Sequence, residues 1–179
     1  MKTVDSTVLV SPPTGELRLT LALNRFGAHR PVEQAFIIAS RLGDGIFWYA
    51  LLAAIITFGG SEGSRAALHM SVVGLFVAGL YRTMKNVVRR PRPCHRHDAI
   101  VARVRPLDEF SFPSGHTLHA VTFSMIAIGY FPVLAWLLVP ASLLIAASRV
   151  ILGVHYPSDV LAAISLGCVI ALASFVLAG

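Results

Sequence analysis

An uncharged run of about 30 residues, from Leu118 to Ala147, constrains this chain more than any other feature. A membrane-spanning helix needs about 20 apolar residues, so this run is too long for one crossing and predicts two. The segment Gly129-Tyr130-Phe131-Pro132 provides the break, because a proline cannot continue the hydrogen bonding of the helix before it. We therefore expect two antiparallel spans, at about residues 116–130 and 132–148.

Three further apolar segments predict additional spans, at about residues 45–60, 66–84 and 160–178. Trp48 and Tyr49 lie near one end of the first, where aromatic residues commonly anchor a helix at the membrane interface. Only 13% of the residues are charged and 55% are hydrophobic, a balance that soluble domains of this size rarely have. The predicted fold class is an all-α, integral-membrane helical bundle of about five spans.

The N-terminal region differs from the spans. Residues 1–16 contain Pro12, Pro13 and Gly15 and are predicted to be a flexible tail. Residues 17–41 alternate apolar side chains with charged ones, which makes them too polar to cross a bilayer. We expect amphipathic helices at the interface there, broken near Gly27 to Pro31. Residues 17–179 are then a single membrane domain.

The order of crossings brings three polar segments to one face of the membrane. The second span ends near Lys85, the third begins after Ser114–His116, and the fourth ends at Arg149, shortly before the fifth begins at Asp159. This convergence follows from counting the spans. The polar residues that meet are Lys85, Arg92, Ser114, His116, Arg149, His155 and Asp159.

These residue types suit the chemistry of a phosphate ester. One lysine and two arginines can neutralise the phosphate and hold its oxygens. Of two histidines, one can attack phosphorus while the other protonates the leaving oxygen. An aspartate beside the attacking histidine fixes its tautomer, and backbone N–H groups at a helix start favour anions.

The spacing of these residues resembles that of a known family. Lys85 is followed after six residues by Arg92-Pro93, then comes Pro113-Ser114-Gly115-His116. Arg149 is followed after five residues by His155 and after three more by Asp159. All three elements, in this order, are similar to those of the type 2 phosphatidic acid phosphatases, a family related to vanadium haloperoxidases and bacterial class A acid phosphatases. The resemblance covers about residues 44–175.

The resemblance implies a role for each residue. His155 is the nucleophile that forms a phosphohistidine, Asp159 orients it, and His116 is the acid for the leaving group and then the base for water. The remaining five bind the phosphoryl group: Lys85, Arg92, Ser114, Gly115 and Arg149. The family needs no metal or other cofactor. Many membrane members have six spans, whereas this sequence predicts about five.

The resemblance also implies a lipid phosphatase in the cytoplasmic (inner) membrane. The candidate substrates are polyprenyl diphosphate, phosphatidylglycerol phosphate, phosphatidate and lipid A phosphates, and the first two are favoured because they recur among small bacterial members of the family. The motifs recognise the phosphate and not the tail, so they do not choose among these lipids. A lipid phosphotransferase is a close variant. Bacterial members often place the site on the periplasmic face, which is the expectation here. A nucleic-acid partner is not expected, since no soluble binding module is visible.

A non-catalytic channel, transporter or headgroup-binding protein is the alternative from another class, and the intact His116 and His155 argue against it. Basic residues beside spans are often topology signals, and Arg90 is open between the phosphate site and lipid headgroups. Four other histidines are expected to have packing or interfacial roles: His69, His95, His97 and His119.

Overall fold

The computed structural model describes residues 14–106 and 108–178. This part of the chain contains eight α-helices and one short 3-10 helix, which confirms the all-α prediction. The helices are α1 (Thr14–Phe26), α2 (Arg30–Leu42), α3 (Ile46–Phe58), α4 (Gly60–Val88), α5 (Pro93–Arg96), α6 (Gly115–Tyr130), η1 (Pro132–Leu134), α7 (Ala135–Ile151) and α8 (Pro157–Ala178).

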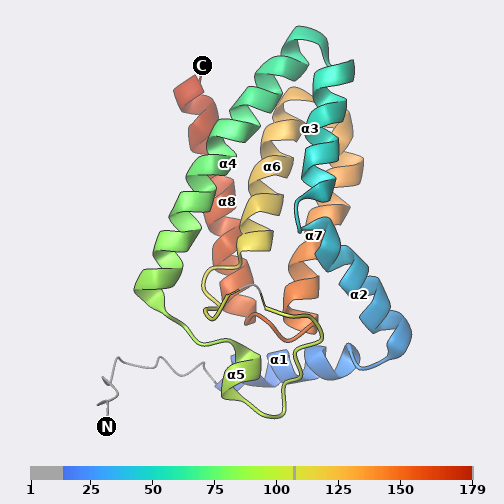
Figure 1. The fold of residues 1–179 in the computed structure, drawn as a ribbon, viewed down its shortest axis with the longest axis vertical. Coiled ribbons are helices and arrows are strands. Elements are labelled where there is room, and N and C mark those ends of the chain that lie inside the picture. The colour runs from blue at the N-terminus through green and yellow to red at the C-terminus, as the bar shows by residue number, and fades with distance from the viewer. Residues whose placement is uncertain (1–13, 107, 179) are drawn as a thin grey trace.

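The long helices run along one axis of the molecule, and α1 lies across its lower end (Figure 1). α6 is central and packs against α4, α7 and α8. The loop between α4 and α6 and the turn between α7 and α8 both lie at the end that carries α1, while α8 finishes at the other end (Figure 1). The three polar segments therefore meet at one end of the bundle, as the crossing order predicts.

The predicted break in the long apolar run is confirmed. α6 ends at Tyr130, η1 begins at Pro132, and α7 starts at Ala135. The Phe131 N–H still donates to the Ala127 carbonyl, after which the chain leaves the helix. The run thus forms two helices that pack against each other.

α2 and α3 are bent by 50° at the joint between them. Gly45 has a φ of +112°, a conformation open to glycine. A Cβ on Gly43 would lie 2.7 Å from Cδ2 of His116, so the close approach of this joint to α6 depends on the glycine. The Gly43-Asp44-Gly45 joint consequently lies beside one of the predicted catalytic histidines.

The N-terminal region is helical from Thr14 onward, so residues 14–16 begin α1 instead of belonging to a tail. Residues 1–13 of the predicted tail lie outside the described residues. The chain breaks between α1 and α2 at residues 27–29, where the sequence predicts it. α1 packs against the lower ends of α7 and α8, which gives the helix a fixed place beside the polar loops.

The candidate spans are fewer than the five predicted. In the described residues, three segments are long and apolar enough to cross a membrane: Gly60–Val88, Pro132–Ile151 and Pro157–Leu177. The bent pair Arg30–Leu42 and Ile46–Phe58 makes a fourth if it is one span. α6 has only 16 residues, which is short for a full crossing of about 20, although it lies at the centre of the bundle.

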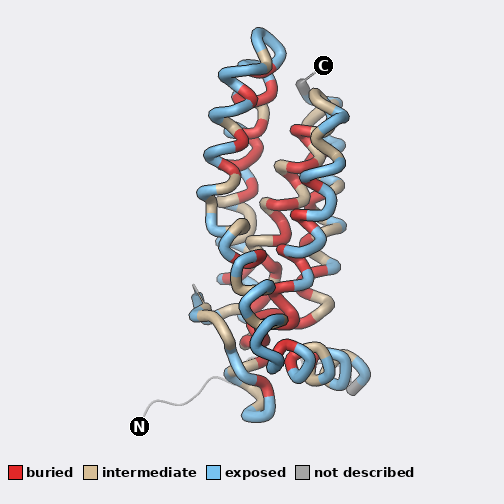
Figure 2. Tube along the Cα trace, turned by 90° about the vertical axis from the view of Figure 1, so that its right-hand side faces the viewer, coloured by how far each residue is buried: buried red, intermediate tan, exposed pale blue. Residues whose placement is uncertain are grey.

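Buried residues face the inside of the bundle and exposed residues face outward along the long helices (Figure 2). The outward face is itself apolar. Trp136 is 88% exposed and Leu75 is 77% exposed, and Leu143, Leu161 and Leu172 are exposed as well. An apolar outer surface of this extent suits contact with lipid chains.

Asn24 connects α1 to the polar end of the bundle. Its side-chain amide nitrogen donates to the carbonyls of Val101 and Ile151, at 2.9 and 3.1 Å, and its amide oxygen accepts from the Val101 N–H at 3.0 Å. One buried amide thereby ties α1, the α4–α6 loop and the end of α7 together. This connection fixes the loop that carries much of the candidate site.

Candidate active site

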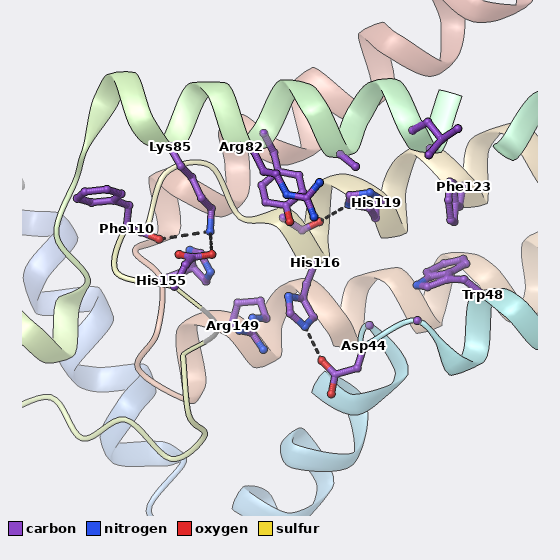
Figure 3. A pocket seen from close by; sticks show the side chains of 18 of the residues that line it. Asp44, Trp48, Arg82, Lys85, Phe110, His116, His119, Phe123, Arg149 and His155 are labelled. Atoms are coloured by element: carbon purple, nitrogen blue, oxygen red, sulfur yellow. Dashed lines mark hydrogen bonds and ion pairs between the residues drawn. The ribbon is translucent and has the colours of Figure 1, made fainter. Parts of the chain in front are cut away.

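A single cavity of about 1030 Å³ receives side chains from α3, α4, α6, α7 and the loops at the polar end (Figure 3). Of the eight predicted site residues, six line it: Lys85, Arg92, Gly115, His116, Arg149 and His155. Further along, the lining becomes apolar, with Trp48, Leu52, Leu75, Ala78 and Phe123. The cavity therefore joins a cationic end to an apolar groove between α3 and α4.

His155 lies in the turn between α7 and α8 and is almost fully buried. Its Nε2 is 3.2 Å from a guanidinium nitrogen of Arg92, and its Nδ1 is 3.6 Å from Oδ2 of Asp159. Burial, together with the charges of Arg92 and Arg149, lowers the pKa of His155 to about 3, although Asp159 acts to raise it. The imidazole is therefore neutral near pH 7 and keeps a lone pair on one nitrogen.

Asp159 does not line the cavity but lies behind His155, in the first turn of α8. Its Oδ2 accepts a hydrogen bond from the Tyr156 N–H at 2.8 Å. Its Oδ1 pairs with Arg90 at 2.8 Å. This aspartate thus combines two tasks: it receives an N–H at the start of a helix, and it presents an oxygen to His155.

Three buried cations line one part of the cavity. Lys85 comes from the last turn of α4, Arg92 from the loop that follows, and Arg149 from the last turn of α7. Arg92 donates to the Val154 carbonyl at 2.7 Å, which holds it against the turn that carries His155. Arg149 donates to the Ser40 hydroxyl on α2. These contacts fix the three cations around a volume suited to one anion.

Asp108 occupies part of that volume. Its carboxylate accepts from Lys85 Nζ at 2.5 Å and from Arg92 at 2.8 Å. Burial raises the pKa of Asp108, but the hydrogen bond from Lys85 and the charges of Lys85 and Arg92 outweigh it and hold the pKa below its ordinary value. A carboxylate thus takes the place of a phosphate at two of the three cations.

His116 stands at the start of α6. Its Nε2 is 2.7 Å from Oδ1 of Asp44, in the joint between α2 and α3. The ring lies between Arg149 and Asp44 (Figure 3). His116 and His155 therefore face one cavity from different elements, each with an aspartate partner of its own.

Ser114 and Gly115 differ in their placement. Gly115 lines the cavity, whereas Ser114 is fully buried outside the lining. The Ser114 hydroxyl is 2.9 Å from the Thr117 hydroxyl, and its N–H donates to the Asp159 carbonyl at 3.3 Å. Ser114 therefore connects the start of α6 to the start of α8. Of the two residues, Gly115 is the one that lines the cavity beside Lys85, Arg92 and Arg149.

Sequence reasoning missed three acids that complete this site: Glu16, Asp44 and Asp108. Asp44 could have been found, because an acid between two glycines at the start of an apolar segment is unusual. Glu16 and Asp108 carry no such local signal. Across residues 14–106 and 108–178, no three His, Cys, Asp or Glu side chains are grouped to hold a metal ion.

Four of the five histidines outside the motifs are those expected to have packing or interfacial roles. The His69 ring is 3.2 Å from the Tyr130 hydroxyl, and it packs edge-on against Phe175. His119 lines the cavity but its Nδ1 lies 3.0 Å from the Gly115 carbonyl of its own helix. His97 packs against the Tyr156 ring, and His95 is exposed.

Comparison with known proteins gives a consistent result. The PAP2 superfamily model matches residues 66–179. Decaprenylphosphoryl-5-phosphoribose phosphatase of Mycobacterium tuberculosis is 32% identical over 164 residues, which cover 88% of each chain. Undecaprenyl-diphosphatase BcrC of Bacillus subtilis is 31% identical over 123 residues, 68% of this chain and 63% of that protein.

The fold has a solved counterpart in the crystal structure of Aquifex aeolicus LpxE. The two share a TM-score of 0.76 at 24% sequence identity, over 94% of this chain and 99% of that one. At this identity the likeness shows the arrangement of helices alone.

Proposed function

This chain belongs to the PAP2 superfamily and is a multi-pass membrane lipid phosphatase, and from that premise we propose that it acts through a phosphohistidine formed on His155. The observation that carries the proposal is the cavity itself. A neutral, buried imidazole lies among three cations at one end, and an apolar groove leads away from them. A lipid phosphate matches this shape, with its phosphate at the cations and its chain in the groove.

The first step transfers the phosphoryl group to the enzyme. The lone pair on Nε2 of His155 attacks phosphorus, and the bond from phosphorus to the lipid oxygen breaks. The electron pair passes to that oxygen, which takes a proton from His116 when the oxygen is too basic to leave unaided. Burial and Arg149 lower the pKa of His116 to about 4, and the negative charge of a bound phosphate, like that of Asp44, raises it and so supplies the protonated form. Asp159 stabilises the positive charge that the His155 ring acquires.

The second step regenerates the enzyme. Water attacks phosphorus while His116 takes its proton, and the phosphorus–nitrogen bond breaks with its electron pair returning to His155. The products are inorganic phosphate and a lipid that carries one phosphate fewer. Lys85, Arg92 and Arg149 neutralise the phosphoryl oxygens throughout, and the incoming phosphate replaces the Asp108 carboxylate at the first two.

We favour a polyprenyl phosphate or diphosphate as substrate. Two relatives that match this chain are named for polyprenyl substrates, decaprenylphosphoryl-5-phosphoribose and undecaprenyl diphosphate. The aromatic and aliphatic lining of the groove suits a hydrocarbon chain.

We further propose that the chain crosses the cytoplasmic membrane five times, with the α2–α3 pair as one bent span and α6 as a short span. The site is proposed to lie on the periplasmic face.

Phosphate release by the purified protein in detergent tests the proposed function. The substrates are a polyprenyl diphosphate, phosphatidylglycerol phosphate and phosphatidate, each with and without EDTA. We expect the prenyl lipid to be hydrolysed fastest and EDTA to have no effect. Loss of all activity in EDTA would contradict the mechanism.

An impermeant short-chain substrate added to intact spheroplasts tests which side of the membrane the site faces.

A larger side chain in the groove is expected to lower kcat/KM only for substrates that carry a long hydrocarbon chain. Ala78→Phe places a ring in the lining of the groove, and forcing such bulk into an occupied space costs about 1–3 kcal/mol. We expect kcat/KM for a long-chain lipid phosphate to fall roughly 10-fold or more, with little change for a water-soluble phosphate ester. Steady-state kinetics on the two substrates measures both effects.

Val72→Phe is the matched control, since Val72 is on the same helix, exposed, and outside the cavity lining. An equal loss for the two substrates in Ala78→Phe would show that the groove does not receive the chain.

A further inference from the structure

Arg90, which the sequence leaves open between two roles, takes neither. It does not line the cavity, and its side chain is only 13% exposed, so it faces neither the phosphate site nor lipid headgroups. One guanidinium nitrogen donates to Oδ1 of Asp159 at 2.8 Å and to the Ser158 hydroxyl at 2.6 Å. The other donates to Oε2 of Glu16 at 2.8 Å. The guanidinium also lies 4.1 Å from the centre of the Tyr156 ring.

These contacts determine the rotation of the Asp159 carboxylate. Arg90 holds Oδ1, and the Tyr156 N–H holds Oδ2 at 2.8 Å, on the side that faces Nδ1 of His155. Asp159 is fully buried, so no solvent can replace a lost partner. Without Arg90, one oxygen of a buried carboxylate would lose its counter-ion, and the carboxylate would be free to turn.

Glu16 holds Arg90 from a distant part of the chain. Its Oε2 accepts from the guanidinium, and its Oε1 accepts from the Ser158 N–H at 2.9 Å. The Ser158 N–H belongs to the first turn of α8, where a carboxylate is favoured by the helix dipole. Glu16 thus fixes both the guanidinium and the start of the helix that carries Asp159. This bidentate contact also gives α1 a place in the site.

We propose that Glu16 and Arg90 are positioning residues for phosphoryl transfer, which hold the Asp159 carboxylate in the rotation that faces Nδ1 of His155. The inference rests on the proposed function of His155 as nucleophile. Bond formation at Nε2 makes the ring cationic, and the contact with Asp159 strengthens at that moment. A misplaced Asp159 therefore weakens the transition state more than substrate binding.

Steady-state kinetics of Arg90→Met and Glu16→Gln tests the proposal. Removing an outer residue that orients a metal ligand typically costs about 10- to 100-fold in activity. We expect the loss of Arg90 or Glu16, which orient Asp159, to lower kcat by a similar factor. KM should change less than about threefold, because neither residue touches substrate. Arg90→Lys should recover part of the loss, since a lysine keeps the charge but not the fork that spans two acids.

The control is Arg89→Met, which removes the same charge from the neighbouring residue. Arg89 is exposed, and its Nε donates to the Asn86 carbonyl of its own helix. We expect it to keep wild-type kcat. The double variant Glu16→Gln/Arg90→Met should lose little more than Arg90→Met alone, because the two residues act through one carboxylate.

Two results would overturn the proposal while the wild type and Arg89→Met are active: an unchanged kcat in both variants, or a loss confined to KM. Glu16→Gln preserves shape, so it decides the matter if Arg90→Met does not yield a monodisperse protein. An inactive wild type would instead count against the proposed function, and the two failures are thereby distinguished.

Discussion

His155→Gln should abolish phosphate release from every lipid substrate, with a fall in kcat/KM of about 10⁴-fold or more, as loss of a covalent nucleophile produces in other enzymes. Glutamine is close in volume and can still accept a hydrogen bond from Arg92. It has no nitrogen lone pair that can attack phosphorus. The cations and the cavity remain, so substrate should still bind, and phosphate release over time is the measurement.

A covalent intermediate provides the second readout of this variant. After brief incubation with a ³²P-labelled lipid phosphate, the wild type should carry label that survives alkali and is released by acid, as a phosphoimidazole does. His155→Gln should carry none. His95→Gln is the control, since His95 is an exposed histidine in the loop of the same site. Residual activity within about tenfold of wild type in a folded His155→Gln protein would show that another group is the nucleophile.

The sequence predicts the arrangement of the candidate site wherever local spacing or the order of the helices determines it. Arg149, His155 and Asp159 lie within one turn and its flanking helix ends, so their order along the chain places them together. The convergence of the three motif segments followed from counting crossings. Both arguments use distances along the chain or whole spans, which a sequence displays directly.

The partners of the three acids in the site could not be predicted in this way, although Asp44 itself stands out between two glycines. Asp44 is 72 residues from His116, and Glu16 is 74 residues from Arg90. Such pairs form only because α1 and the α2–α3 joint pack against the polar end of the bundle. Asp108 pairs with a lysine 23 residues away, across a loop without a regular pattern. Hydropathy shows neither the packing of α1 nor the path of that loop.

Span lengths were also beyond the sequence argument. Residues 45–60 look like one short span, yet α3 has 13 residues and is continued across a 50° bend by α2, whose charges had suggested an interfacial position. The bend lies at Gly43–Gly45, where Gly43 leaves room for the His116 ring, and hydropathy does not show such a tertiary contact. The same glycines therefore explain both the bend that ends α3 short of a full span and the position of Asp44.

His116→Gln is expected to divide substrates by their leaving groups. General acid catalysis contributes about 10²- to 10⁴-fold when the leaving oxygen needs a proton. Phosphatidate releases a basic alkoxide, so its kcat/KM should fall by that amount. A prenyl diphosphate releases a lipid phosphate, and an aryl phosphate releases a phenolate. Both leave without a proton, so their kcat/KM should fall far less.

The second step should reveal the other role of His116. With an aryl phosphate, His116→Gln should form phosphoenzyme at a nearly normal rate but hydrolyse it slowly, since no base activates water. A burst of phenolate equal to the amount of enzyme should then precede a slow steady state. Asp44→Asn should slow both steps by a smaller factor. Asp44, at 2.7 Å from the His116 ring, orients that ring and favours its protonated form but transfers no proton itself. His29→Gln, exposed and between α1 and α2, is the control. Equal losses for alkyl and aryl substrates, without a burst, would show that His116 binds phosphate and transfers no proton.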